Sequence, residues 1–253
     1  MNDANAHNAP LLRLSIIVPC FNEEENLPPL IEAVFKALSS DPRFVELILV
    51  DDGSSDHTSE IVRGMSAYEP RLRLVAHARN RGLGTAIRTG LEAATGDYVL
   101  YTDADLPFDF GQIPRLLTQA HDDQVVIGYR SNRGEGVRRW LLSKGYNLLC
   151  RAVFGLRVRD VNFACKLFPR RAVEGMRLGS EGSFIDAEML LECRNLGLET
   201  TEFPLVYRPR MRGCSTLSRT SVIARILAEM VNYKLHRARP KYEVIEKTDH
   251  QCG

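Results

Sequence analysis

Four mostly apolar runs recur along the first part of the chain, and three of them are followed directly by proline or an acidic residue. They cover residues 14–18, 45–50, 72–76 and 96–102. Continuous apolar runs of this length are typical of strands buried on both faces of a parallel sheet. Segments of helical character separate them, as in folds that alternate strands and helices. The sequence therefore predicts an α/β fold with a mostly parallel, doubly wound sheet flanked by helices.

Polar residues mark where the first two helices should begin. We expect the first helix to open within residues 21–26, with Asn22 or Asn26 as its N-cap and acidic residues in its first turn. Ser55 or Asp56 should cap the second helix. Both predicted starts follow directly on a strand.

The loop after the fourth strand carries two carboxylates, Asp103 and Asp105, within the sequence YTDADLPFD. Residues two apart in an extended chain project from the same face, so both carboxylates can point into one crevice. Hard oxygen ligands of this kind suit Mg²⁺ or Mn²⁺. A bare D-x-D motif is more often a polar turn. However, residues 51–56 and 79–85 place two further loops at the carboxyl ends of strands, where open α/β sheets bind ligands.

The loop at residues 79–85 holds two glycines, Gly82 and Gly84, just before a predicted helix. Such glycines are typical of backbone that approaches a phosphate-bearing ligand. They are equally typical of an ordinary turn and cap. The spacing alone leaves both interpretations open.

The net charge is only +1, but the basic residues are concentrated in two segments. Residues 130–171 hold eleven Lys and Arg against two acids, and residues 208–241 hold nine against one. Such segregation favours an anionic partner: a phosphate group, a membrane surface or nucleic acid. Amphipathic helices predicted at 137–154 and 217–236 fit a membrane surface, although packing of their apolar sides on the sheet is the commoner arrangement.

The six cysteines are scattered singly, without the C-x-x-C spacing of a zinc site or the density of a secreted scaffold, so we expect reduced thiols. The first ten residues do not resemble a signal peptide, and no run of 18 apolar residues occurs. We expect a cytoplasmic protein, soluble or peripheral on the cytoplasmic face of a membrane. The predicted division is a polar tail at 1–13, one α/β domain at 14–216, and an amphipathic helix with a tail at 217–253.

Six motifs occur in order along residues 14–217: SIIVPCFNEEENL, ILVDDGSSDHT, RNRGLGTAIRTGL, YTDADL, RWLLSKGYNLL and RPRMRGCSTL. Together they resemble the family 2 inverting glycosyltransferases, and among them the polyprenyl-phosphate sugar synthases of the dolichol-phosphate mannose synthase type. The resemblance implies a GT-A fold and transfer of a hexose, mannose or glucose, from a GDP- or UDP-sugar with Mg²⁺ or Mn²⁺. It implies a polyprenyl or dolichyl phosphate acceptor at a membrane surface, no nucleic acid, and an anchoring partner that the sequence does not identify.

By motif position, the resemblance also implies site residues. The nucleotide-sugar pocket would be formed by Pro19, Phe21, Glu23, Val50, Asp52, Asp103 and Ala104. The metal would be held by Asp103 and Asp105, and Asp105 would take part in catalysis. The remaining catalytic, phosphate-contacting positions would be Arg130, Arg139, Ser143 and Arg210.

The chain departs from the synthase pattern at two positions. Pro107 stands where the synthases usually carry a glutamine that binds the metal, so Asp109 or water would have to complete the coordination. Thr216 stands where their R-x-x-G-x-S-K box ends in lysine, so Arg212 or Arg219 would have to supply that phosphate contact.

Two other functions fit the same sequence. Hydroxyl-directed relatives use a carboxylate base, and Asp186 and Glu188 lie in the region where they carry it. The helix macrodipole alone would also favour acids there. The other alternative is a catalytically silent sugar-nucleotide-binding subunit, which the intact Asp103 and Asp105 disfavour. A lipid phosphate, in contrast, is already anionic near neutral pH and needs cations rather than a base.

Overall fold

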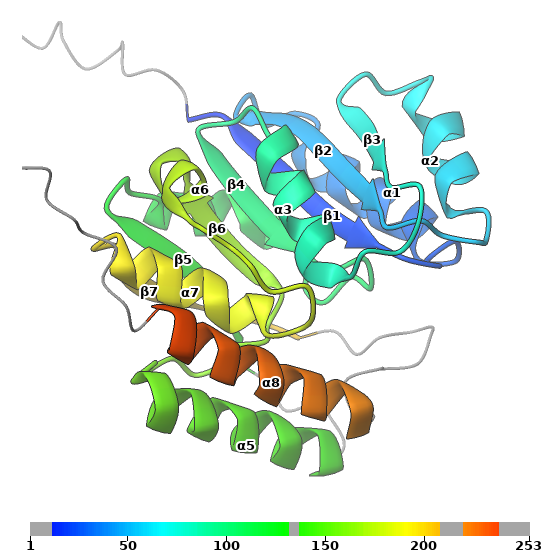
Figure 1. Cartoon of the computed structure of the whole chain (residues 1–253). Coiled ribbons are helices and arrows are strands. Elements are labelled where there is room, and N and C mark those ends of the chain that lie inside the picture. The colour runs from blue at the N-terminus through cyan, green and yellow to red at the C-terminus, as the bar shows by residue number, and fades with distance from the viewer. Residues whose placement is uncertain (1–11, 132–136, 208–219, 238–253) are drawn as a thin grey trace, which may run out of the picture.

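A seven-stranded sheet forms the centre of the molecule (Figure 1). The computed structural model describes residues 12–131, 137–207 and 220–237. The strand order is β3-β2-β1-β4-β6-β5-β7. The strands are β1 (Leu14–Cys20), β2 (Phe44–Asp51), β3 (Leu72–Ala76), β4 (Tyr98–Thr102), β5 (Gln124–Arg130), β6 (Cys165–Pro169) and β7 (Glu199–Leu205).

The sheet is mostly parallel, which confirms the predicted fold class. β1 pairs in parallel with β2 and β4, β2 with β3, and β5 with β7. β6, which the sequence did not predict, lies antiparallel between β4 and β5. Cys165, the first residue of β6, pairs with Thr102, the last residue of β4. The residues just before β6 and just after β4 therefore meet at one edge of the sheet.

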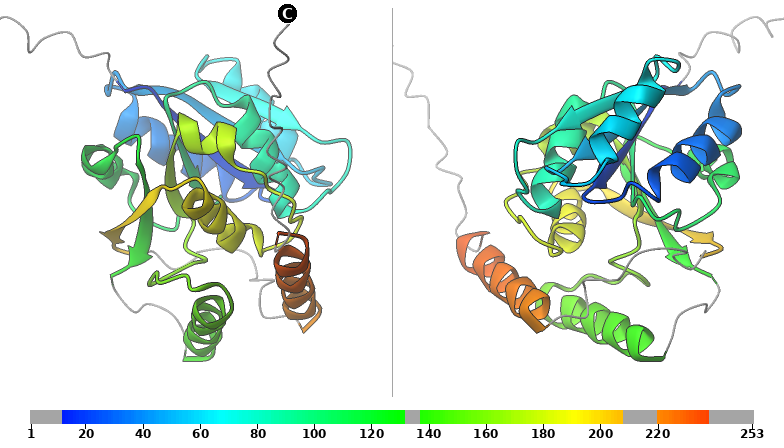
Figure 2. Two further views of the ribbon diagram at one scale, coloured as in Figure 1. Left: turned by 60° about the vertical axis from the view of Figure 1, so that its left-hand side comes forward. Right: turned by 90° about the vertical axis from the view of Figure 1, so that its right-hand side faces the viewer.

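Helices cover both faces of the sheet (Figures 1 and 2). Neighbouring residues of one strand face opposite ways, so Ile16 packs in the cluster under α1 and α2, whereas Ile17 packs in the cluster under α3 and α7. The helices are α1 (Leu27–Leu38), α2 (Thr58–Ser66), α3 (Leu83–Ala93), α4 (Ile113–Leu116), α5 (Val137–Phe154), α6 (Arg170–Gly175), α7 (Ile185–Asn195) and α8 (Thr220–Arg237), with short 3₁₀ turns η1 (Phe110–Gln112) and η2 (Leu117–Gln119).

The predicted starts of the first two helices are confirmed in part. α1 starts directly after Asn26, one of the two predicted N-caps, but the acids at 23–25 precede the helix instead of lying in its first turn. Asn22 has a positive φ of 55° and belongs to the loop. α2 starts after His57. Asp56 still supports that start, because its carboxylate accepts a hydrogen bond from the backbone N–H of the first helical residue (3.0 Å).

α5 and α8 form an outer layer beside α7 (Figures 1 and 2). Three aromatic rings join them: Phe154 of α5 and Tyr233 of α8 each lie 5.7 Å from Phe184, the residue before α7, and 5.8 Å from each other. Ile226 and Met230 of α8 are buried in the same apolar cluster. The predicted burial of the apolar side of this helix is thus confirmed for these two residues.

The cysteines of the described part of the chain, Cys20, Cys150, Cys165 and Cys193, are all free and buried, as expected for reduced thiols. Burial raises the pKa of the Cys150 thiol to about 11 and those of Cys165 and Cys193 to about 12. These thiols are therefore protonated and poorly reactive at neutral pH.

Candidate active site

The loops that follow β1 and β2 are bonded to each other. The Ser54 hydroxyl accepts a hydrogen bond from the Asn22 N–H (2.9 Å), and the Asn22 side-chain oxygen accepts one from the Ser55 N–H (2.8 Å). The Glu23 N–H donates to the Thr58 hydroxyl (2.9 Å). These bonds fix the segment that carries Glu23, a predicted pocket residue, against the carboxyl end of β2.

Three other predicted pocket residues lie at the same edge of the sheet. Pro19 and Val50 are register partners in the β1–β2 ladder, and both are buried. Phe21 follows β1 and is 44% exposed. Its predicted role in the nucleoside pocket stays a prediction.

The carboxylate of Asp52 holds the loop after β3. Its oxygens accept hydrogen bonds from the backbone N–H groups of Arg81 (3.0 Å) and Gly82 (2.8 Å), and it lies 2.6 Å from Nδ1 of His77. The other ring nitrogen of His77 lies 2.9 Å from the Thr89 hydroxyl. The sequence indicated neither the contact of Asp52 with this loop nor its contact with His77. This buried carboxylate holds the loop in place, and the predicted contact with base or ribose stays a prediction.

A second loop lies against the two glycines of the 79–85 segment. A Cβ at Gly84 would lie 2.0 Å from the backbone oxygen of Ser180, and one at Gly82 would lie 2.5 Å from that of Glu181. The Gly84 N–H donates to the same Glu181 oxygen (2.9 Å). Contact with residues 180–181 therefore explains why these positions lack side chains, without any phosphate-bearing ligand.

Asp103 and Asp105 lie at the carboxyl end of β4, on either side of the buried Ala104. The Tyr101 hydroxyl donates a hydrogen bond to Oδ1 of Asp103 (3.0 Å). Desolvation, followed by the negative charges of Asp105 and Asp186, raises the pKa of Asp103 to about 7. The negative charges of Asp105 and Asp186 thus disfavour ionisation of Asp103.

A divalent cation fits this distribution of charge, because it would bind to Asp103 and Asp105 and offset their repulsion. Among the described residues, no group of three or more His, Cys, Asp or Glu side chains is arranged to hold a metal ion. A cation would therefore take its other ligands from a diphosphate and water, as Mg²⁺ commonly does. Asp109, the predicted substitute for the ligand missing at Pro107, caps η1 by accepting a hydrogen bond from the Gly111 N–H (3.0 Å).

Arg130, the last residue of β5, is held by three side chains that sequence analysis did not single out. Its guanidinium forms an ion pair with Asp160 (3.0 Å) and lies over the rings of Phe163 (5.3 Å) and Tyr207 (4.9 Å). Asp160 and Phe163 come from the segment just before β6, which the antiparallel pairing brings to this edge. An arginine fixed on aromatic faces presents its remaining N–H groups in a defined direction.

Two of the remaining predicted phosphate-contacting residues belong to α5. Ser143 is half-buried, and the side chain of Arg139 lies outside the described part of the chain. Arg210 and the box that ends in Thr216 also lie outside the described residues. Their predicted roles stay predictions.

α5 is attached to the segment that carries Asp160. The side-chain amide of Asn147 donates to the backbone oxygen of Arg159 (2.9 Å), and its oxygen accepts from the Val161 N–H (3.1 Å). One α5 side chain thus bonds the residues on both sides of Asp160, the ion-pair partner of Arg130.

The two acids considered as alternative bases both have partners within the protein. Glu188 accepts hydrogen bonds from the backbone N–H groups of Gly179 (2.9 Å) and Ser180 (2.8 Å). Asp186 forms an ion pair with Lys166, which is fully buried. Both carboxylates therefore support local structure, beyond any favourable interaction with the α7 macrodipole.

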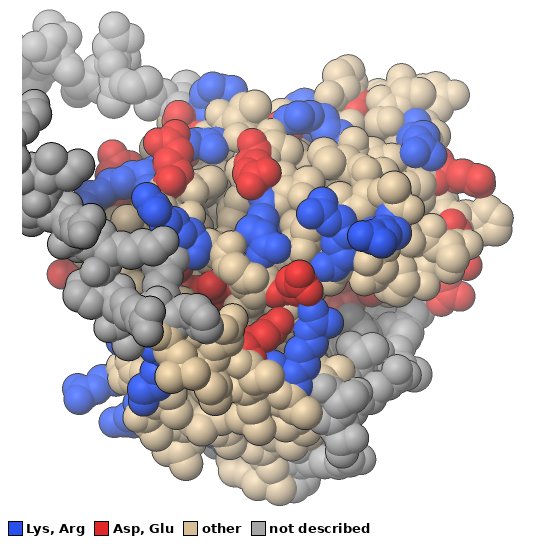
Figure 3. Space-filling view, in the orientation of Figure 1, with Lys and Arg blue, Asp and Glu red and all other residues tan. Residues whose placement is uncertain are grey.

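The outer layer exposes most of the large apolar side chains on the described surface. We call these residues the α5/α8 apolar face: Trp140, Leu141, Leu142, Leu148, Ile223, Leu227, Val231 and Leu235, which are 36–67% exposed. Figure 3 shows a largely uncharged surface over these helices. Across the described ranges, no helix combines the length and the apolar character needed to cross a membrane.

Comparison with known proteins agrees with this geometry. The model of the family "Glycosyl transferase family 2" matches residues 15–177. Undecaprenyl-phosphate 4-deoxy-4-formamido-L-arabinose transferases from Pectobacterium atrosepticum and Pectobacterium carotovorum are 33% and 37% identical over 209 residues, which is 81% of this chain. The chain spans 62% of the length of these curated relatives.

The fold also matches solved structures. Glucosyl-3-phosphoglycerate synthase from Mycobacterium tuberculosis, crystallised with Mn²⁺, UDP-glucose and phosphoglyceric acid, superposes with a TM-score of 0.68 at 24% identity over 87% of this chain and 80% of that one. The molecule thus has the α/β architecture of the GT-A class. The chain belongs to glycosyltransferase family 2.

Proposed function

We propose that this protein transfers a sugar from a nucleotide-sugar donor to a polyprenyl phosphate, with inversion at the anomeric carbon and with Mg²⁺ or Mn²⁺. The observation that carries the proposal is the position of Asp103 and Asp105 at the same edge of the sheet as Arg130. The names of the Pectobacterium relatives, which specify transfer to undecaprenyl phosphate, support the same acceptor class.

The chemistry follows from the charges of the two substrates. A cation held by Asp103 and Asp105 would stabilise the negative charge that develops on the departing diphosphate. Tyr101 orients Asp103 through its hydroxyl. Arg130, fixed by Asp160, would bind the acceptor phosphate through its guanidinium. That phosphate, with a second pKa of about 6, can attack without a general base.

The sugar and the nucleotide base are the finer part of the proposal. We propose a hexose, mannose or glucose, carried by GDP or UDP. Because the Pectobacterium relatives are named for a formamido-arabinose, the donors to be compared should include a UDP-linked 4-amino or 4-formamido pentose. Binding of UDP, GDP and their sugars, measured by calorimetry with Mn²⁺, ranks the candidates.

The acceptor class separates this proposal from hydroxyl glycosylation. Purified protein with Mn²⁺ and the best donor should glycosylate undecaprenyl phosphate and leave undecaprenol unmodified. Glu188→Gln should keep turnover within about tenfold of wild type, because glutamine has the same shape and retains an oxygen acceptor for one of the two N–H groups of Gly179 and Ser180. Transfer to undecaprenol, or complete loss of activity in Glu188→Gln, would instead support a carboxylate base. Nucleotide binding without turnover on either acceptor would support a silent binding subunit.

We propose that the α5/α8 apolar face rests on the membrane that contains the lipid acceptor, with residues 14–216 as the catalytic domain and residues 217–253 as the attached helix and tail. Burial of one leucine-sized side chain contributes about 1.5–3 kcal/mol. Glutamates at Leu227 and Val231, which are 45% and 58% exposed, should therefore lower flotation with anionic vesicles at least about tenfold.

The matched control is Tyr68→Glu, which changes an apolar side chain that is 91% exposed but lies outside the apolar face. It should leave flotation unchanged. Equal flotation of the Leu227/Val231 variant and the wild type would remove the membrane role from α8.

A further inference from the structure

Lys166 occupies an unusual place for a lysine, the middle of the central sheet. It belongs to β6, pairs with Tyr101 of β4 and is fully buried. A buried ammonium group is unfavourable unless it is paired and hydrogen-bonded. Nζ of Lys166 donates to the backbone oxygen of Phe163 (3.0 Å) and to the carboxylate of Asp186. The buried charge thus has a buried counter-charge, which is only 8% exposed.

The same ammonium group adjoins the carboxylate pair at the end of β4. Its Nζ lies 5.4 Å from the centroid of the Tyr101 ring, and the Tyr101 hydroxyl donates to Asp103. The ammonium group therefore contacts Asp186 directly and reaches Asp103 through the Tyr101 side chain. One buried cation therefore acts on both Asp186 and Asp103.

We propose that Lys166 sets the charge balance beside the cation site. It neutralises Asp186, so that Asp103 and Asp105 alone attract the cation. The inference rests on the proposed function only for the place where the cation binds, and is independent of the sugar and the acceptor. It also explains how Asp186 can lie beside the site without acting as a base.

Calorimetric titration of Mn²⁺, with UDP or GDP present, tests the charge balance. Asp186→Asn leaves the positive charge of Lys166 uncompensated near the site, and we expect Mn²⁺ affinity to fall at least about tenfold, since a unit charge acts on a divalent ion in a medium of low effective dielectric. Lys166→Met removes that positive charge and should not weaken Mn²⁺ binding. The double variant, which carries neither charge, should bind Mn²⁺ within about threefold of wild type.

Thermal unfolding, recorded for each variant, separates this effect from a loss of structure. The matched control is Arg73→Met, which breaks an ion pair with Glu46 at the other end of the sheet. It should lower the Tm but leave Mn²⁺ affinity unchanged. Weakening of Mn²⁺ binding in both single variants would show that the Lys166–Asp186 pair is structural support only. A double variant as weak as Asp186→Asn would show that Asp186 itself binds the cation.

The two proposals fail in different ways. If the wild type binds Mn²⁺ and nucleotide but does not glycosylate lipid phosphate, the proposed function is wrong, and the role of Lys166 is still decided by the titrations. If transfer to lipid phosphate occurs but Asp186→Asn and Lys166→Met do not differ in their effect on Mn²⁺ affinity, the proposed role of Lys166 is wrong and the proposed function stands.

Discussion

Replacing Asp105 by alanine should lower sugar transfer by at least about 10²–10³-fold and leave the fold intact. The expected loss follows from removal of one of the two carboxylates that would hold the cation at the departing diphosphate. Asp105 lies in the loop after β4, so the substitution opens no cavity in the apolar core. Initial rates with saturating donor and acceptor, compared at equal folded concentration, measure the effect.

The matched control for this substitution is Asp97→Asn. Asp97 directly precedes the same strand at its other end, where its carboxylate accepts a hydrogen bond from the Arg13 N–H (2.8 Å). This variant should keep wild-type turnover. Full activity of Asp105→Ala would reject the cation-binding role of the pair.

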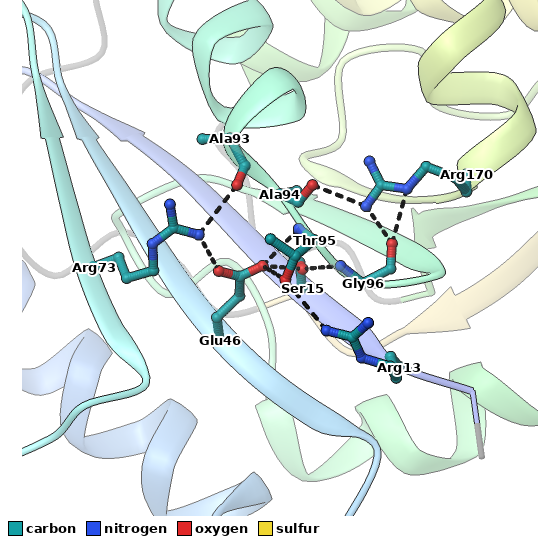
Figure 4. A network of polar contacts seen from close by, with 9 residues as sticks. All are labelled: Arg13, Ser15, Glu46, Arg73, Ala93, Ala94, Thr95, Gly96 and Arg170. Atoms are coloured by element: carbon teal, nitrogen blue, oxygen red, sulfur yellow. Dashed lines mark hydrogen bonds and ion pairs between the residues drawn. The ribbon is translucent and has the colours of Figure 1, made fainter. Parts of the chain in front are cut away.

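Replacing Glu46 by alanine should destabilise the protein by about 3 kcal/mol. Glu46 is 5% exposed and joins several strands at the amino end of the sheet (Figure 4). Its carboxylate accepts hydrogen bonds from the Ser15 hydroxyl (2.6 Å) and from the Thr95 N–H and hydroxyl (2.7 Å each), and it pairs with Arg73. Removal of the carboxylate leaves these donors without their acceptor oxygens.

Denaturant unfolding at pH 7 measures this loss. Turnover per folded molecule should stay unchanged, because the network lies at the end of the sheet opposite the carboxylate pair. A destabilisation below about 1 kcal/mol, the net contribution of a single hydrogen bond, would contradict the importance of the network.

The same network gives a dependence of stability on pH. Burial alone would raise the pKa of Glu46, but the hydrogen bonds from Ser15, Thr95 and Arg73 outweigh it and hold the pKa below its ordinary value. A carboxyl group of this kind stabilises the fold fully above its unfolded pKa of about 4.3, and the contribution is lost as the pH falls through the folded value. The Tm difference between wild type and Glu46→Gln should therefore shrink below about pH 4.

Strands with uninterrupted apolar runs could be predicted from sequence, because burial on both faces leaves a continuous local signal. The predicted run at 14–18 lies within β1 (Leu14–Cys20), in which every residue is buried. The sequence did not predict β6, a short strand with Lys166 as its second residue. The partner that makes this lysine tolerable, Asp186, is 20 residues away in sequence, and nothing local indicates that the two meet.

The candidate site shows the same limit. Asp103 and Asp105 stand out because they directly follow an apolar strand. The contacts that shape their surroundings are between distant segments: Asp52 with the backbone of Arg81, and Gly84 with Glu181. Where two loops pack together only in the folded protein, the sequence shows only glycines and isolated acids. Such residues have several interpretations as long as the loop that they contact is unknown.

The central claim is tested most directly by the product of a single reaction. Purified protein should be incubated with Mn²⁺, the nucleotide-sugar that binds best and undecaprenyl phosphate, and the lipid product should be examined by mass spectrometry and NMR. We predict a glycosyl phosphate whose anomeric configuration is opposite to that of the donor. A product with retained configuration, or a sugar attached only to a hydroxyl group, would contradict the account.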